Sequence, residues 1–206
     1  MALSFAKLAF TPSVLAEQEK RGSAEGYAKF LSDERQGGDV LTMAEAAFLL
    51  ERDGFYMSTV SETGWPYVQF RGGPAGFIKL LDEKTIGFAD LAGNRQYLST
   101  GNLRANPRVA LIAMDYPNAR RLKLWGRVRI IEAEDNPEAA EALRPQGSTA
   151  RIERLVLITV EAFDWNCPRH IPRRLTVEEF AGETLELRKE VERLKAALAQ
   201  ATSTTA

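Results

Sequence analysis

The sequence predicts an α+β protein that is mainly β, with antiparallel strands between helices at both ends of the chain. The apolar spacing is helical before Phe55, alternates with a period of two from there to about residue 163, and is helical again near the C-terminus. Short loops rich in Gly, Asp, Asn and Ser separate the alternating runs, which is typical of hairpins. We therefore expect one sheet domain with a helical segment on either side.

The composition of the 206-residue chain fits a single domain with appendages. The formal net charge is −1, so the charge balance favours neither nucleic acid nor a membrane surface as a partner. One cysteine, Cys167, excludes an internal disulfide framework and fits a cytoplasmic protein. Lys7 interrupts the N-terminal apolar residues, so neither a signal peptide nor a membrane span is expected.

Three helices are expected in the N-terminal segment, residues 1–54. Pro12 can start the first helix, and the second runs around Tyr27. Thr42 and Glu45 have the spacing of a capping box for the third. The segment is expected to pack on the sheet domain and cover its ends, and a role as a lid or substrate wall stays open.

The sheet domain, residues 55–175, contains seven alternating or apolar runs. The predicted strands are residues 55–60, 66–70, 77–81, 85–89, 108–114, 120–131 and 154–163. After its first residue the run 108–114 is wholly apolar, so it is expected to be buried on both faces. The run 120–131 has one apolar row and one basic, aromatic row. That basic row could bind single-stranded nucleic acid, be solvated or form an interface, and the near-neutral net charge argues against nucleic acid.

A turn and a helix are predicted between the fourth and fifth strands. Gly93 and Asn94 form a turn dipeptide, and Asn is a favoured N-cap, so a helix is expected from Arg95 to Arg104. Asn106 precedes a proline and ends it. The unpaired N–H groups at a helix start, together with Arg95, can bind an anion. The alternative is a capped surface helix whose arginine is solvated.

These features occur in a particular order along the chain: a basic residue on a strand (Lys79), a turn, the tripeptide Asn94-Arg95-Gln96 opening a helix, and a restart at N-P-R-V. With them, residues 55–131 and a second piece at 163–174 resemble the pyridoxamine 5′-phosphate oxidase-like family of FMN-binding split β-barrels. The N-terminal block and the D-W-N-C-P-R-H-I-P stretch look like a branch distinct from the oxidase itself. The resemblance implies an antiparallel split β-barrel, FMN as the cofactor, and a homodimer with FMN between its subunits.

The resemblance also implies which residues bind the cofactor. They are Arg71, Lys79, Asp90, Asn94, Arg95, Gln96, Arg121 and Trp165. The FMN phosphate is expected on Lys79, Arg95 and the helix start near Asn94, with a hydrogen bond from Gln96.

The other implied positions concern the flavin itself. Arg71 stands where the family has an arginine in contact with FMN, Arg121 where the oxidase has a flavin-contacting polar residue, and Trp165 where it has a tryptophan against the flavin. Asp90 replaces a hydroxyl residue at a strand end and either faces the flavin or helps to form the turn.

The resulting prediction is an FMN-dependent oxidoreductase acting on a small molecule, with no catalytic residue assigned. In place of the oxidase's histidine-containing motif the chain has residues 169–174, R-H-I-P-R-R, at a different spacing. The substrate is therefore open, and Arg173 or Arg174 can still reach a phosphate. Two alternatives remain: a flavin-binding protein without turnover, and a split-barrel relative that uses deazaflavin F420 or haem.

Two further features stay open at this point. Cys167 and His170 could ligate a metal or form a catalytic pair, but a closed zinc site needs four ligands and an activated thiolate needs an orienting group. No metal site is therefore predicted. In the C-terminal segment, residues 176–206, a helix is expected over 184–199 with a short heptad seam at Leu187, Val191, Leu194 and Leu198. The seam either packs on the domain or pairs in a dimer, and the last residues are expected to fray.

Overall fold

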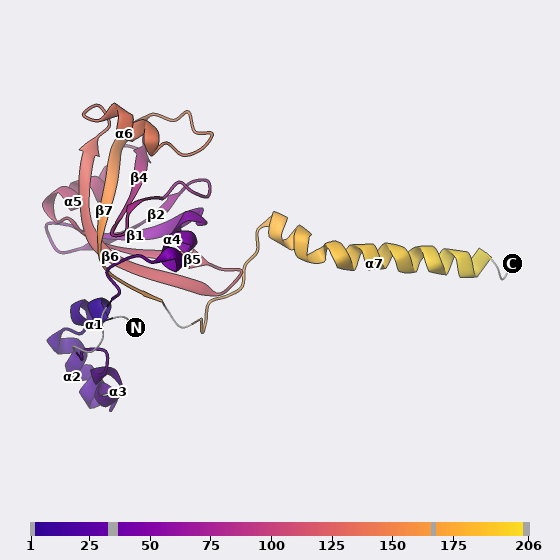
Figure 1. The fold of residues 1–206 in the computed structure, drawn as a ribbon, viewed down its shortest axis with the longest axis horizontal. Coiled ribbons are helices and arrows are strands. Elements are labelled where there is room, and N and C mark those ends of the chain that lie inside the picture. Colours follow the sequence, from indigo (N-terminus) through magenta and orange to yellow (C-terminus); the bar gives the residue numbers. More distant parts are fainter. Residues whose placement is uncertain (1–2, 33–36, 166–167, 204–206) are drawn as a thin grey trace.

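The computed structural model describes residues 3–32, 37–165 and 168–203. Seven strands form one antiparallel sheet in the order β2-β1-β5-β6-β7-β4-β3 (Figure 1). The strands are β1 (Gly54–Val60), β2 (Pro66–Gly72), β3 (Lys79–Asp82), β4 (Thr85–Leu91), β5 (Arg108–Asp115), β6 (Arg120–Glu132) and β7 (Ile152–Trp165). Because β2 and β3 remain as edges, the sheet curls without closing. The predicted class, α+β and mainly β with an antiparallel split barrel, is confirmed.

The inward rows of the long central strands build the core. Leu122 and Leu124 of β6 and Ile158 of β7 are almost fully buried, while the basic row of β6 faces outward. Phe55 packs against Phe88 at 5.4 Å between ring centroids. The predicted alternation of β6 is thus confirmed, because one face of this strand lies in the barrel and the other outside it.

The burial of β5 differs from the sequence prediction. Its residues alternate between buried and accessible, and Ile112 is 38% exposed, so the expectation of burial on both faces is wrong. The outward row of β5 continues an apolar surface formed by Tyr56, Val68 and Phe70 on β1 and β2. We call Tyr56, Val68, Phe70 and Ile112 together the outer apolar face. No part of the described chain covers it enough to bury it.

Two of the N-terminal helices pack on the barrel. In α1 (Leu3–Ala9) Phe5 is buried and its ring lies 4.9 Å from that of Trp125. This short helix was not predicted, because seven residues show too little periodicity and its stability comes from that packing. In α4 (Met43–Leu50) the predicted capping box of Thr42 and Glu45 is confirmed, and Phe48 reaches the core.

The remaining short helices lie at the margins of the barrel. The helices α2 (Pro12–Lys20) and α3 (Ala24–Ala28) bury none of their own residues and lie below the barrel in the view of Figure 1. Helix α6 (Pro137–Ala142) covers the outward side of β7, and Asn136 caps it as predicted by accepting the N–H of Ala139.

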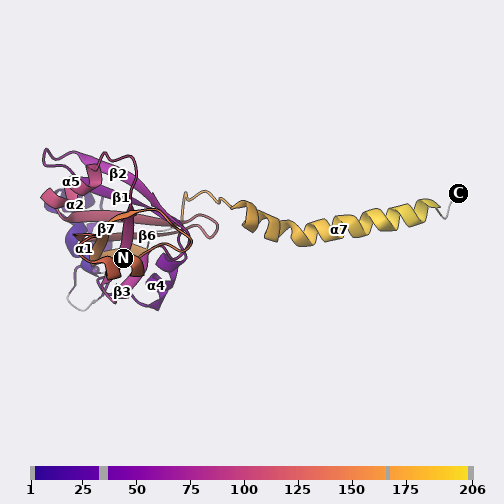
Figure 2. The ribbon, with the colours of Figure 1, turned by 90° about the horizontal axis from the view of Figure 1, so that it is seen from above.

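The C-terminal helix is longer than the sequence prediction. Helix α7 (Val177–Ser203) starts seven residues before the expected Thr184 and points away from the barrel in two perpendicular views (Figures 1 and 2). A second capping box explains the early start: Thr176 accepts the N–H of Glu179, whose carboxylate accepts the N–H of Thr176. Across the described residues, no helix is both long and apolar enough to cross a bilayer.

Candidate functional site

The segment after β4 makes a sharp turn instead of the first turn of a helix. Arg95 and Tyr97 have φ values of 63° and 55°, so helix α5 (Leu98–Ala105) starts only at Leu98. Asn94 accepts the N–H of Gln96 at 3.2 Å. The prediction that Asn94 caps a helix starting at Arg95 is therefore wrong, because left-handed residues cannot belong to a right-handed helix. Such non-glycine conformations cost of order 1–3 kcal/mol and cluster at functional sites.

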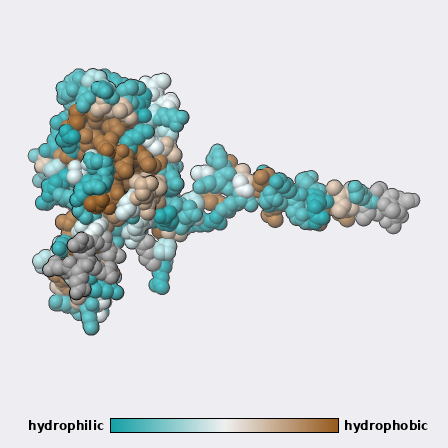
Figure 3. Space-filling model, viewed as in Figure 1, coloured by the Kyte–Doolittle hydropathy of each residue, from teal (hydrophilic) through white to brown (hydrophobic). Residues whose placement is uncertain are grey.

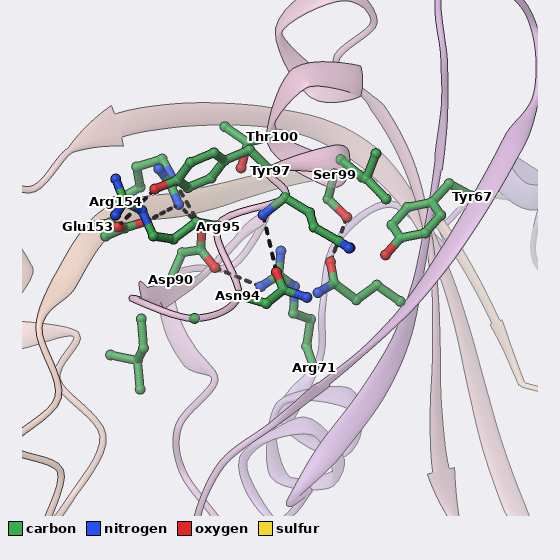
Figure 4. Close-up of a pocket in the computed structure, with 15 residues that line it drawn as sticks. Tyr67, Arg71, Asp90, Asn94, Arg95, Tyr97, Ser99, Thr100, Glu153 and Arg154 are labelled. Carbon is green, nitrogen blue, oxygen red and sulfur yellow. Dashed lines mark hydrogen bonds and ion pairs between the residues drawn. The ribbon is translucent and has the colours of Figure 1, made fainter.

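This turn forms one wall of a pocket of about 240 Å³ (Figure 4). The other walls come from β2, the end of β4 and the start of β7. The charged residues that line the pocket are Arg71, Asp90, Arg95, Glu153 and Arg154. Figure 4 shows Tyr67 on the side opposite Arg154 and Glu153. We call this site the arginine pocket.

A buried carboxylate holds two of the arginines together. Asp90 Oδ1 accepts a hydrogen bond from Arg71 Nη1 at 2.6 Å, and Oδ2 accepts from Arg154 Nε at 3.0 Å and Nη2 at 2.9 Å. Arg71 lies on edge strand β2, and Asp90 lies on β4, next to the other edge. The ion pair therefore links the two sides of the barrel opening.

Arg154 is also bound from a second direction. It donates to Glu153 Oε2 at 2.6 Å, and its guanidinium carbon lies 4.9 Å from the centre of the Tyr97 ring. Burial alone would lower the pKa of Arg154, but the hydrogen bonds and charges of Asp90 and Glu153 outweigh it and raise the pKa. Arg154 is therefore permanently charged, and the negative charge of Asp90 is offset.

The guanidinium of Arg95 is exposed in this pocket and available to a ligand. Within the described part of the chain, Arg95 makes no ion pair. Arg71 Nε is buried and has no hydrogen-bond partner. The pocket thus combines an offset carboxylate with the free guanidinium of Arg95, which is an arrangement suited to an anion.

Side-chain hydrogen bonds fix α5 and its preceding turn on the barrel. Ser99 Oγ lies 2.8 Å from Gln69 Oε1 on β2, and Asn102 Nδ2 donates to Thr59 Oγ1 on β1 at 3.0 Å. Ser99 and Thr59 are almost fully buried. The wall of the arginine pocket is therefore held by the sheet.

The structure places Arg121 and Trp165 elsewhere in the chain. They line a second hollow, together with residues of α4 and of the turn between β5 and β6. Arg121 Nε is buried there without a hydrogen-bond partner. We call this site the Trp165 hollow. Of the predicted cofactor residues, Arg71, Asp90, Asn94, Arg95 and Gln96 thus meet in one pocket, and Arg121 and Trp165 meet in another.

Trp165 is held by three neighbours. Its Nε1 donates to Glu45 Oε1 at 2.7 Å, its ring contacts Phe48 edge-on at 4.8 Å, and the guanidinium of Arg120 lies 4.7 Å from it. Burial of Glu45 acts to raise its pKa, but hydrogen bonds from Thr42 and Trp165 outweigh burial and lower the pKa. The ionised carboxylate therefore stabilises the folded state.

We expect this contribution to depend on pH. A carboxyl whose pKa is lower in the folded state stabilises the fold above its unfolded pKa, near 4.5, and less as the pH falls. Replacing Glu45 by glutamine should therefore lower the free energy of unfolding at pH 7, and the difference from the parent should shrink below pH 4.5. Urea unfolding of the parent and the variant, from neutral pH to about pH 3, measures this difference in the free energy of unfolding. The exposed Glu62→Gln variant is the control, and a difference that stays constant from neutral pH to about pH 3 would contradict the assignment.

Lys79 lies outside both of these sites. It stands at the start of β3 and lines a further hollow with Arg129 and apolar residues of β7 and α6. Within one chain the structure therefore does not bring Lys79 and Arg95 into the same pocket. Its predicted contact with the phosphate stays a prediction.

The sequence prediction missed Arg154, Glu153 and Tyr97. A signal for Arg154 exists: it shares the inward row of β7 with Val156 and Ile158, as Asp90 shares the row of Phe88 on β4. A charge in register with a core row requires a partner of opposite sign. Tyr97 carries no comparable signal, because its position depends on the left-handed turn.

The structure describes only one residue of the proposed Cys167 and His170 pair. Cys167 lies outside the described residues, while His170 is exposed with a φ of 64°. Among the residues that are described, no group of three or more His, Cys, Asp or Glu side chains could hold a metal ion.

Comparison with solved structures shows similar folds. The crystal structures of HupZ from Group A Streptococcus and of a single-residue variant of it are similar to this chain at 17% and 19% identity, each with a TM-score of 0.50. They cover 66% and 61% of this chain and 99% of their own. A putative pyridoxamine 5′-phosphate oxidase from Lactobacillus delbrueckii has 18% identity and a TM-score of 0.48, covering 61% of this chain and 94% of its own.

The similarity to the two HupZ structures supports the split-barrel fold, and the sequence match supports the family. No curated protein matches the sequence. The family model described as Pyridoxamine 5'-phosphate oxidase matches residues 41–166, which is more than half of the chain. The chain therefore belongs to the pyridoxamine 5′-phosphate oxidase family.

Proposed function

We propose that the protein binds FMN and acts as an FMN-dependent oxidoreductase on a small-molecule substrate. One observation carries the proposal. Among the described residues, three buried side-chain atoms lack a hydrogen-bond partner: Gln18 Oε1, Arg71 Nε and Arg121 Nε. Both of the unpaired donors belong to residues that the sequence analysis assigned to the cofactor. Leaving such a group unpaired costs about 1–3 kcal/mol, so a bound acceptor would be favoured at both places.

The arginine pocket is the proposed phosphate site. Arg95 projects from a strained turn and makes no ion pair within the described chain, and Gln96 beside it has an amide able to donate. Arg71 and Arg154 supply further positive charge, while Asp90 is already bound by both. A dianionic phosphate fits this donor set.

The reactive chemistry would come from the cofactor. Bound FMN supplies hydride or electron transfer, and the protein contributes binding and orientation. In this proposal Arg71 and Arg95 hold the phosphate, Gln96 adds a neutral hydrogen bond, and the turn at Asn94 fixes the position of Arg95. No residue of the chain is assigned as an acid or base.

We further propose that two copies of the chain share each site. The arginine pocket, at about 240 Å³, is smaller than the roughly 300–1,000 Å³ of usual ligand pockets. Arg121 and Trp165 line a separate hollow of the same chain. The outer apolar face is exposed and could be buried against a second copy. A symmetric homodimer would let the arginine pocket of one subunit meet Arg121 and Trp165 of the partner subunit.

Mixed dimers test this arrangement. Arg95→Ala and Arg121→Ala chains are co-expressed with different tags, and FMN is supplied at a concentration that fills the parent and leaves either variant empty. Random mixing makes half of the dimers hybrids, each with one intact site, so about a quarter of all sites should bind FMN. If each site lies within one chain, the mixture binds no more FMN than the separate variants, which would overturn the shared site.

A further inference from the structure

The linker before helix α7 contacts the barrel. In this linker, Arg173 Nε donates to the backbone oxygen of Pro117 at 3.2 Å, and the Arg174 guanidinium lies 5.0 Å from the Tyr116 ring. From Val177 onward the helix extends away from the sheet in both views (Figures 1 and 2). The alternative in which its seam packs on the domain is therefore not what this structure shows.

The apolar residues of α7 form a longer seam than the sequence analysis recognised. Residues 177, 180, 184, 187, 191, 194 and 198 follow alternating steps of three and four, and all of them except Thr184 are apolar. This pattern assigns Thr184 and Val191 to heptad position a and Leu187 and Leu194 to position d. Figure 3 shows hydrophobic patches along a helix that is otherwise mostly hydrophilic.

The seam is exposed along the helix. The exposed fractions are 53% for Phe180, 67% for Leu187, 43% for Val191 and 52% for Leu194. In proteins most of the stability of a helix comes from packing its apolar face. A helix of 27 residues with four such side chains exposed therefore needs a partner to cover the seam.

The charges beside the seam specify the partner. Glu183 and Glu190 occupy g positions, while Arg188 and Lys195 occupy e positions. In a parallel pair each g residue faces the e residue five positions later on the other helix, which joins Glu183 to Arg188 and Glu190 to Lys195. An antiparallel pair would set glutamate against glutamate and base against base.

We propose that α7 pairs in parallel with α7 of a second copy of this chain, as a two-stranded coiled coil. Val191 at a with Leu187 and Leu194 at d is the combination that favours parallel dimers. Thr184 is a polar residue at an a position, where it contributes less to the stability of the pair than an apolar residue. The present ion pairs of these residues, Glu183 with Arg173 of the linker, Glu190 with Arg193 and Lys195 with Glu192, are exposed and can exchange for the interhelical pairs at little cost. This interaction surface does not depend on the flavin site.

Disulfide cross-linking of the full chain tests the pairing. In a Cys167→Ser background, Leu194→Cys places a thiol on the seam, and Ala196→Cys places one at position f on the opposite face. In a parallel pair the two copies of residue 194 face one another at disulfide distance. We expect about tenfold more cross-linked dimer for Leu194→Cys than for Ala196→Cys under mild oxidation, because pairing raises the effective concentration of the seam thiols. Leu187→Cys, also at d, should behave like Leu194→Cys.

A charge exchange tests the register. On the Leu194→Cys background, Glu190→Lys and Lys195→Glu should each reduce cross-linking, and a mixture of the two should give mainly the mixed product. Equal cross-linking of the seam and control variants, or none from either seam variant, would overturn the coiled coil. A statistical mixture of products would overturn the parallel register. FMN titration of the same variants under reducing conditions measures binding at the barrel site independently of the cross-link. Failure of the coiled-coil proposal therefore leaves the FMN proposal testable, and the reverse.

Discussion

Replacing Arg95 by alanine is expected to lower the affinity for FMN by about ten- to a hundredfold. Hydrogen bonds between charged partners contribute about 1.5–3 kcal/mol, and about 1.4 kcal/mol corresponds to a factor of ten in Kd. Arg95 lines the arginine pocket and has no ion pair within the described chain, so its loss is not compensated. Titration of flavin-free protein with FMN, followed by quenching of flavin fluorescence, measures the change.

Two further variants make this result specific. Arg151→Ala removes an exposed arginine that lies close in sequence to the pocket residues Glu153 and Arg154 without lining the pocket, and it should leave the affinity unchanged. Lys79→Ala tests the contact between Lys79 and the FMN phosphate that was predicted from the sequence. Within one chain Lys79 lies in a separate hollow. If Arg95→Ala binds FMN as tightly as Arg151→Ala does, the phosphate does not lie in the arginine pocket.

Replacing Asp90 by alanine is expected to lower the free energy of unfolding by about 3–5 kcal/mol. That is the usual cost of breaking a buried ion pair, because the remaining charge stays buried without compensation. Here two arginines are affected at once: Arg71 loses the ion pair that it makes with Asp90, and Arg154 keeps its ion pair with Glu153 but loses the two hydrogen bonds to Asp90. Urea unfolding of the parent and the variant, with the far-UV signal as readout, measures the loss.

The matched control removes an exposed carboxylate from the neighbouring turn. Glu83→Ala lies between β3 and β4, and surface changes of this kind usually stay within about 0.5 kcal/mol. A loss for Asp90→Ala no larger than that of Glu83→Ala would show that the carboxylate does not hold the barrel opening together.

The fold was predictable because it depends on local patterns. Alternating or apolar runs predicted all seven strands, since the long central strands each place one row of side chains in the barrel. The burial of β5 was not predictable from its apolar run, because the accessibility of Ile112 depends on which neighbouring strands lie beside it. The early start of α7 was readable from Thr176 and Glu179, whose capping box was overlooked.

The candidate site was predictable only in part. The position of Arg95 after the turn was identified, but its left-handed conformation is set by how α5 is tied to β1 and β2. The partners of Asp90 come from strands far away in sequence, so only the folded sheet reveals them. The separation of Arg121 and Trp165 from the arginine pocket likewise follows from strand order.

The central claim is that this chain holds FMN, and the absorption spectrum of the freshly purified protein tests it most directly. The material released on denaturation is identified by mass, and flavin-free protein is then titrated with FMN. The account predicts a two-banded yellow spectrum, release of FMN, and saturable rebinding. Release of deazaflavin or haem instead, or a colourless protein that takes up no FMN, would contradict the proposed function while leaving the split barrel unchanged.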